Sequence, residues 1–177
     1  MRPTRMVRYA LVTLAVLCAV GARVPLRAQE VVQPSHISLN AGLVQLDMAG
    51  SGWGPMLAGR AAFPLANVFL IEGSILASRP GQDIRTTTML MPEAQIQLAL
   101  PFTRVVPYMG LGAGAAIDFR GDSEGGTRGR VTISGSVGGK WWLREGLGAQ
   151  VEWRARGVGA DFEGSANEYS LGFIHAL

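Results

Sequence analysis

PYMGLGAGAAIDFR, residues 107 to 120, decides the fold because its side chains alternate between two kinds along the whole stretch. A period of two is typical of a β-strand, in which successive side chains point to opposite faces. The stretch therefore predicts a strand with one apolar face and one narrow, partly charged face. The odd positions are Met109, Leu111, Ala113, Ala115, Ile117 and Phe119, and the even positions are Tyr108, Gly110, Gly112, Gly114, Ala116, Asp118 and Arg120.

The same alternation recurs in seven other segments of the chain. Three short connections, at 64–67, 101–104 and 144–146, alternate with four longer, mostly glycine-containing connections. Strands joined in sequence by short turns pair antiparallel. The pattern therefore predicts an all-β, eight-stranded antiparallel up-and-down barrel. We expect its other strands at residues 36–47, 56–63, 68–78, 86–100, 128–143, 147–156 and 167–177.

Two residues test this assignment locally. Trp53 lies among glycine and serine residues, so we place it in the first long loop. Pro92 lies inside the fourth strand segment, although proline has no N–H for a sheet ladder. We therefore expect a β-bulge at Pro92, or a membrane-embedded part that begins after it.

The N-terminus has the pattern of a cleavable signal peptide. Arg2, Arg5 and Arg8 precede an uncharged run over residues 9–20, which is too short to span a bilayer as a helix. Residues 26–28, LRA, then offer a cleavage site. We expect residues 1–28 to be a signal peptide and residues 29–177 to form the β-barrel domain; the alternative for the N-terminal segment is a short membrane anchor.

Removal of this leader changes the charge and the cysteine content. Five of the 16 basic residues and none of the 13 acidic residues lie in the leader, so the mature chain has 11 basic and 13 acidic residues, a net charge of −2. This charge gives no reason to expect a nucleic acid as a partner. Cys18 is the only cysteine and leaves with the leader, which excludes thiol catalysis and disulfides in the mature chain.

The charged residues of the narrow face decide between a membrane barrel and a soluble one. Alternation alone does not do so, because a soluble barrel of lipocalin type reverses the two faces. Five charges of each sign suit a narrow lumen that is filled by ion pairs, and inward glycines leave room for the long side chains. Short turns at one rim and longer loops at the other are typical of outer-membrane barrels. The inward charges are Arg60, Arg120, Lys140, Arg154 and Arg156, with Glu72, Glu93, Asp118, Glu152 and Glu168.

We therefore predict a transmembrane β-barrel in the outer membrane of a Gram-negative-type bacterium. Aromatic residues anchor such barrels at the membrane interfaces. Four are expected near the short-turn rim: Phe63, Phe69, Trp141 and Tyr169.

The chain resembles the small eight-stranded outer-membrane barrels of the OmpA and OmpX type over roughly residues 35–177. The resemblance rests on the pattern Pro-Tyr-x-Gly-x-Gly-x-Gly at 107–114, on Arg60 facing Glu72, and on alternate Tyr169, Leu171 and Phe173 in the last strand. Members of this group commonly end in Phe or Trp, whereas this chain ends in Leu177. The resemblance implies insertion by the barrel-assembly machinery and contact with outer-membrane lipid.

For function, we expect a non-enzymatic structural or surface-interaction barrel that is monomeric. The alternative is a small pore or a carrier for small or hydrophobic solutes; a lipid A-modifying enzyme is the weaker one. His36 and His175 fall near the short-turn rim of neighbouring strands, where they could meet or loosely hold a metal. Two ligands make a weak site, so we expect no catalytic, cofactor or metal site. Asp118, Lys140, Arg154 and the other inward charges are instead candidates for lumen ion pairs.

Overall fold

The computed structural model describes residues 33–47, 52–79, 87–100, 104–120 and 127–177, which contain eight strands. The predicted signal peptide, residues 1–28, lies outside the described residues. No helix in the described part of the chain is long and apolar enough to cross a membrane. The strands are β1 (His36–Asp47), β2 (Trp53–Ala66), β3 (Phe69–Ser78), β4 (Thr87–Ala99), β5 (Val105–Arg120), β6 (Arg128–Arg144), β7 (Leu147–Val158) and β8 (Gly164–Ala176).

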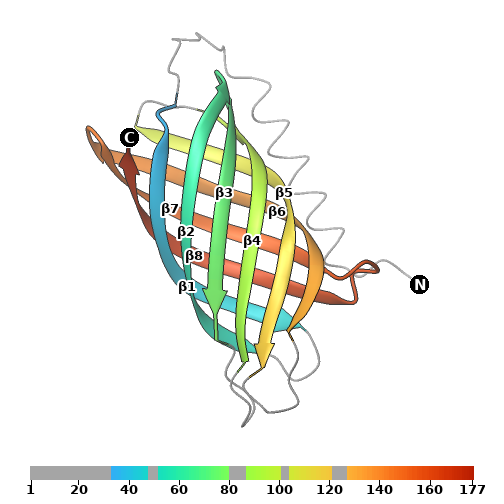
Figure 1. The fold of residues 1–177 in the computed structure, drawn as a ribbon. Helices are drawn as coiled ribbons and strands as arrows, with labels where there is room; N and C mark the ends of the chain where they lie inside the picture. The colour runs from blue at the N-terminus through green and yellow to red at the C-terminus, as the bar shows by residue number, and fades with distance from the viewer. Residues whose placement is uncertain (1–32, 48–51, 80–86, 101–103, 121–126) are drawn as a thin grey trace, which may run out of the picture. The chain divides into compact units, whose positions relative to one another are not determined.

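The strands form a closed barrel in which each strand pairs antiparallel with the next and β1 closes on β8 (Figure 1). The closing ladder runs from His36 opposite Ala176 to Asp47 opposite Ser165. Closure leaves no free strand edge, which the hydrocarbon of a bilayer could not hydrogen-bond. The predicted all-β, eight-stranded up-and-down barrel is confirmed.

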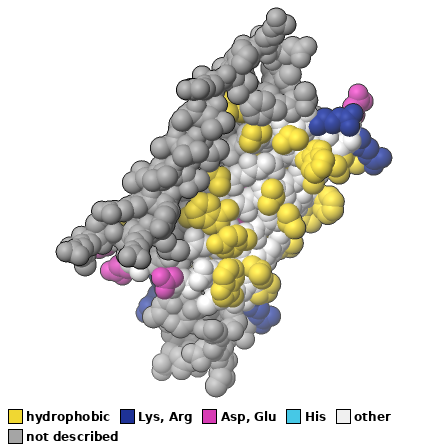
Figure 2. All heavy atoms as spheres, turned by 180° about the vertical axis from the view of Figure 1, so that it is seen from behind, with side chains coloured by type: hydrophobic (Ala, Val, Ile, Leu, Met, Phe, Trp, Pro, Cys, Tyr) yellow, Lys and Arg dark blue, Asp and Glu magenta, His cyan; other side chains and the backbone are white. Residues whose placement is uncertain are grey.

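The two faces of the barrel wall have opposite chemistry. Leu111 and Phe173 on the outside are 76% and 77% exposed, whereas Arg154 and Glu168 on the inside are 0% exposed. This distribution is the reverse of that in a soluble protein. Figure 2 shows hydrophobic side chains spread over one side of the wall, with charged side chains gathered toward its two ends. The outer face is therefore the face that meets lipid.

Several strand ends differ from the predicted ones, most of all in β2. The segment predicted as 56–63 extends to Trp53–Ala66, and Trp53 pairs with Gln45 of β1 instead of lying in a loop. Gly54 and Pro55 are local turn signals, but the neighbouring β1 holds both in its ladder.

The bulge expected at Pro92 is wrong. Pro92 pairs with Ile75 of β3, and no register shift occurs along β4. On the β5 side the paired positions stop at Leu90 and resume at Glu93 in the same register. The proline is therefore accommodated by a gap in one ladder.

The aromatic residues form groups near both rims. Phe63, Phe69 and Trp141 lie near the short turns, as predicted. Tyr169 does not, because its ring lies 5.8 Å from that of Trp53, which begins β2 beside a long loop. Aromatic residues at both interfaces are typical of transmembrane barrels.

Candidate functional site in the barrel lumen

The centre of the lumen is built around Arg154 on β7, which is fully buried. Its guanidinium donates from Nε to Glu152 at 2.8 Å, from Nη1 to Glu93 at 2.6 Å and from Nη2 to Glu72 at 2.8 Å. These carboxylates come from β7, β4 and β3, so one side chain ties three strands together across the lumen. The planar fork of arginine suits several carboxylates at once.

Two further arginines close a ring of alternating charge. Arg156 donates from Nε to Glu93 at 2.9 Å and from Nη1 to Glu168 at 2.8 Å. Arg60 forms an ion pair with Glu168 and has its Nη1 2.7 Å from Glu152. Glu152 also pairs with Arg154, so the series of ion pairs closes on itself. We call this set the ion-pair ring; it comprises Arg60, Arg154, Arg156, Glu93, Glu152 and Glu168.

Glu72 lies beside the ion-pair ring. It pairs with Arg154 of the ring and is linked to Lys140 through the side-chain amide of Gln97. Gln97 donates to Glu72 at 2.8 Å and accepts from Lys140 Nζ at 3.1 Å. Lys140 Nζ also lies 3.0 Å from His36 Nε2, while His36 Nδ1 lies 2.8 Å from the carbonyl of Pro34. A carbonyl can only accept, so Nδ1 carries the hydrogen and Nε2 accepts from Lys140. Within the described part of the chain, Lys140 has no carboxylate at ion-pair distance, so its charge is met by neutral partners.

The inward glycines of β5 make room for this network. A side-chain carbon added at Gly110 would lie 2.5 Å from Gln95, and one at Gly112 would lie 2.8 Å from the Ser134 hydroxyl. Gln95 hydrogen-bonds to Ser136 at 2.6 Å, and Ser134 to Glu93 at 2.9 Å. The glycines are therefore needed for close approach, as the alternation predicted.

Two apolar layers enclose the charged centre. At the long-loop end, strand ends contribute one buried cluster: Val44, Leu46, Met56, Ala58, Leu76, Met89, Met91, Ala116, Val158 and Ala166. At the short-turn end lies a second cluster: Ala62, Leu70, Ala99, Val106 and Tyr108, with Trp142 packed against it. We name them the long-loop layer and the short-turn layer. Sequence reasoning missed both, although the inward positions of Met89 and Met91 in the alternation were a usable signal.

The remaining predicted lumen charges lie apart from the ring. Asp118 pairs with Arg130 at 3.0 Å, on the long-loop half of β5 and β6. Arg120 ends β5, and its side chain lies outside the described part of the structure. The expected facing pair Arg60 and Glu72 is wrong: Arg60 pairs with carboxylates on β7 and β8, whereas Glu72 pairs with Arg154. Both side chains reach across the lumen instead of along the wall.

The two histidines do not meet. The seam places His175 opposite Ile37, so His36 faces the lumen at 2% exposure while His175 faces outward. The ring of His36 instead packs edge-on against Trp142 at 5.9 Å. Among the described residues, no group of three or more His, Cys, Asp or Glu side chains could hold a metal ion.

Comparisons with known proteins identify the fold. No protein-family model matches the sequence, and no curated protein matches it. Neisserial surface protein A is similar in structure, with a TM-score of 0.70, 12% identity, and coverage of 81% of this chain and 97% of that one. The attachment invasion locus protein Ail of Yersinia pestis has a TM-score of 0.59 and 13% identity, covering 82% of this chain and 99% of that chain. The N-terminal β-barrel domain of Pseudomonas aeruginosa OprF has a TM-score of 0.57 and 14% identity, covering 80% and 97%. The chain therefore has the fold of these small eight-stranded outer-membrane β-barrels.

Proposed function

We propose that the protein is a sealed, monomeric outer-membrane barrel that acts through its long-loop rim, in a structural or surface-contact role, and neither conducts solutes nor catalyses a reaction. The observation that carries this proposal is the filled lumen. The ion-pair ring lies between two apolar layers, and Arg154, Glu152 and Glu168 at its centre are at most 2% exposed. A barrel filled in this way leaves its loops as the part that can meet other molecules.

The alternative of a pore or carrier requires a wet path along the barrel axis. Ions would have to pass the long-loop layer, which is apolar, before they reached any charged group. Apolar constrictions close channels by excluding water. Beyond this layer, ions would have to break the ion-pair ring, in which each arginine is held by at least two carboxylates.

The alternative of a lipid A-modifying enzyme requires a histidine with an acidic or hydroxyl partner near the outer rim. His36 lies in the lumen beside Lys140 and Trp142, and His175 lies on the outer face at the short-turn end. Neither position offers that arrangement. The names of the structural neighbours, a surface protein and an attachment protein, agree with a surface-contact role.

Conductance measurements test the proposal. The refolded protein, inserted in a planar lipid bilayer at high salt, should show no stable current steps. The different gel mobility of boiled and unboiled samples verifies separately that the protein is folded, so that the absence of current cannot be attributed to unfolded protein. A large, stable conductance would overturn the sealed barrel, and slower uptake of small solutes by cells that lack the protein would favour the carrier.

A further inference from the structure

Two side-chain amides lie on the lipid-facing side of the barrel wall. Gln45 on β1 and Asn167 on β8 are directly opposite each other, and both occupy outward positions of the alternation. Among the outward positions of the strands, as far as the structure describes them, amide side chains occur only at these two. Side-chain amides are unusual on a face that meets hydrocarbon.

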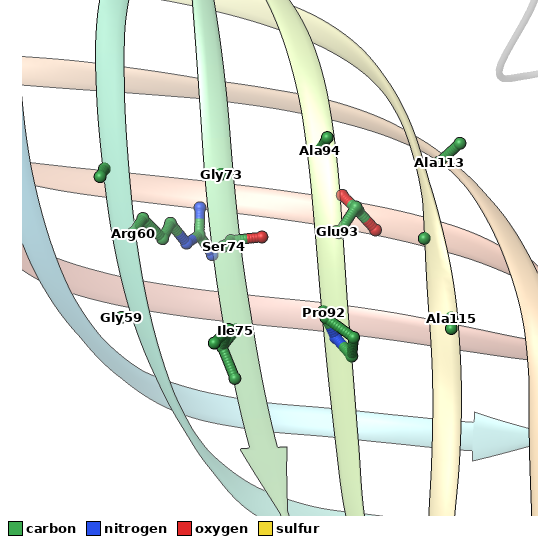
Figure 3. Close-up of a pocket in the computed structure, with 12 residues that line it drawn as sticks. Gly59, Arg60, Gly73, Ser74, Ile75, Pro92, Glu93, Ala94, Ala113 and Ala115 are labelled. Carbon is green, nitrogen blue, oxygen red and sulfur yellow. The ribbon is translucent and has the colours of Figure 1, made fainter.

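Another part of the wall shows the usual arrangement. Over β2 to β5 lies a shallow hollow in the outer wall, lined by small residues such as Gly73, Ala94 and Ala113 (Figure 3). Arg60 and Glu93 on the same strands are buried and turn toward the lumen. The hollow therefore presents apolar groups to lipid, as a wall in hydrocarbon should.

The protein does not satisfy the two outward amides. Within the residues that the structure describes, the side chains of Gln45 and Asn167 form no hydrogen bond. A polar group without a partner in hydrocarbon is strongly unfavourable. A group of the surrounding lipid at the same depth must therefore supply the hydrogen bonds.

The pairing register places the amides at the outer edge of the apolar band. Strands of such barrels tilt by about 35–45° and lie about 4.8 Å apart, so each step along a row of paired residues changes the depth by about 3 Å. The row through Leu111, near the midplane, reaches Phe63 at the short turns after three steps in one direction. In the other direction it reaches Asn167 after three steps and Gln45 after four. The amides therefore lie about 9–12 Å from the midplane on the long-loop side, at the edge of a band about 25 Å tall.

Two aromatic rings lie beside the amides. Trp53 pairs with Gln45, and Tyr169 is two residues from Asn167 on the same face. Their ring centroids are 5.8 Å apart with planes inclined by 31°, and the two residues are 50% and 48% exposed. The rings therefore meet over β1 and leave apolar area exposed next to hydrogen-bonding groups. Such a surface suits a sugar, which carries C–H groups on its faces and hydroxyls around its edge.

A cation lies next to the aromatic rings. Arg79 directly follows β3 in an outward position, and its backbone N–H donates to the carbonyl of Pro55, two residues from Trp53. Its side chain is exposed and, among the described residues, has no carboxylate at ion-pair distance. The carboxylate of Asp47 lies on the other side of the site, where Asp47 pairs with Ser165. Arginine binds phosphate oxygens through two parallel hydrogen bonds.

We propose that these residues bind the headgroup of a phosphorylated glycolipid of the outer leaflet, of the lipid A class. Gln45 and Asn167 hydrogen-bond to the amide and hydroxyl groups where the acyl chains join the sugar. The rings of Trp53 and Tyr169 cover the sugar, and Arg79 holds a phosphate. The proposal depends on the long-loop rim facing the cell exterior and not on whether the lumen conducts.

A phospholipid fits this site less well. At the depth of the two amides it offers ester carbonyls, which can only accept a hydrogen bond. Each side-chain amide has donors as well as an acceptor. The amide-linked acyl chains of an amino-sugar lipid provide both kinds of group.

Native mass spectrometry on the refolded full mature chain in detergent tests the site, with synthetic lipid A and phosphatidylglycerol added in competition. Phosphatidylglycerol is anionic and has no sugar, so it controls for charge alone. The amide variant is Gln45→Leu with Asn167→Leu, which should fold because it makes the lipid-facing wall more apolar. Gln45→Leu alone replaces it if gel mobility shows that the double variant is unfolded.

The wild type should retain one lipid A in preference to phosphatidylglycerol. The amide variant should bind lipid A about tenfold more weakly, because two hydrogen bonds are lost. Arg79→Gln should lower the affinity for lipid A and leave the affinity for its phosphate-free form unchanged. Arg144→Gln, the matched control at the short-turn end of β6, should change neither affinity.

Three results would overturn the site. The first is retention of phosphatidylglycerol by the wild type at least as strong as that of lipid A, and the second is an unchanged lipid A affinity in the amide variant. The third is a loss of lipid A affinity in Arg144→Gln as large as that in Arg79→Gln.

Discussion

Arg154 and Lys140 are both buried cations in the lumen, but their partners differ. Arg154 binds three carboxylates, whereas Lys140 is held by a histidine, an amide and the ring of Tyr108, 4.9 Å away. A guanidinium can bridge several carboxylates, while an ammonium group acts as a compact point charge. Loss of the Arg154 charge should therefore destabilise the barrel more than loss of the Lys140 charge.

Replacing each of these cations by methionine should separate the two roles. Arg154→Met leaves three buried carboxylates with one cation fewer, so we expect a loss of about 3–5 kcal/mol or more in the free energy of unfolding. Lys140→Met leaves neutral acceptors unpaired, with an expected loss of about 1–3 kcal/mol. Urea unfolding in lipid vesicles, followed by tryptophan fluorescence, measures both. Equal losses would contradict the assignment of Arg154 as the centre of the network.

At the scale of the strand, alternation places lipid-facing and lumen-facing residues with a period of two. Leu111 lies near the middle of β5 (Val105–Arg120) and Val105 at its short-turn end, and both face outward. One strand therefore offers two positions that share a face and differ in membrane depth. The cost of a charge on that face should follow the depth.

Arginine at these two positions tests the membrane depth of β5. Leu111→Arg should cost about 2–4 kcal/mol because it lies near the midplane, and Val105→Arg about 0–1 kcal/mol because it lies near the interface. The free energy of unfolding in vesicles, compared with that of the wild type, gives both values. A larger cost at Val105 would show that the bilayer is centred elsewhere on the wall.

At the scale of the whole barrel, the connections set the orientation. β7 and β8 are joined by residues 159–163 at the long-loop rim, whereas β6 and β7 are joined by a tight turn at Glu145 and Gly146. Short turns face the periplasm in outer-membrane barrels. The long-loop rim should therefore face the cell exterior.

Single cysteines test this orientation, because the only native cysteine, Cys18, falls in the predicted leader. Asp161→Cys and Glu145→Cys each place a thiol at an exposed position on one of the two rims. A membrane-impermeant maleimide should label Asp161→Cys on intact cells and Glu145→Cys only after lysis, with the wild type as the blank. The opposite labelling pattern would show that the long-loop rim faces the periplasm.

The sequence by itself determined the strand number, the order of short and long connections, and the inward placement of Arg60, Glu72, Glu93, Glu152, Arg154 and Glu168. Each follows from a local rule, since a period of two assigns every residue to a face whatever its neighbours are. Export by a signal peptide at residues 1–28, the absence of a catalytic or metal site, and the monomeric state stay predictions.

Only the tertiary structure decided which inward charges meet. Long side chains cross the lumen, so Arg60 reaches β7 and β8, and Glu72 reaches Arg154, at distances that depend on register and closure. The same holds for His36 and His175, which neighbouring strands at the seam place on opposite faces. Other features also arise from several strands at once. They are the regular register of β4 at Pro92, the two apolar layers that enclose the ion-pair ring, and the hollow in the outer wall lined by Ala61, Gly73, Ala94 and Ala113. A periodic pattern in one strand carries no information about which residues the pairing register of several strands brings together.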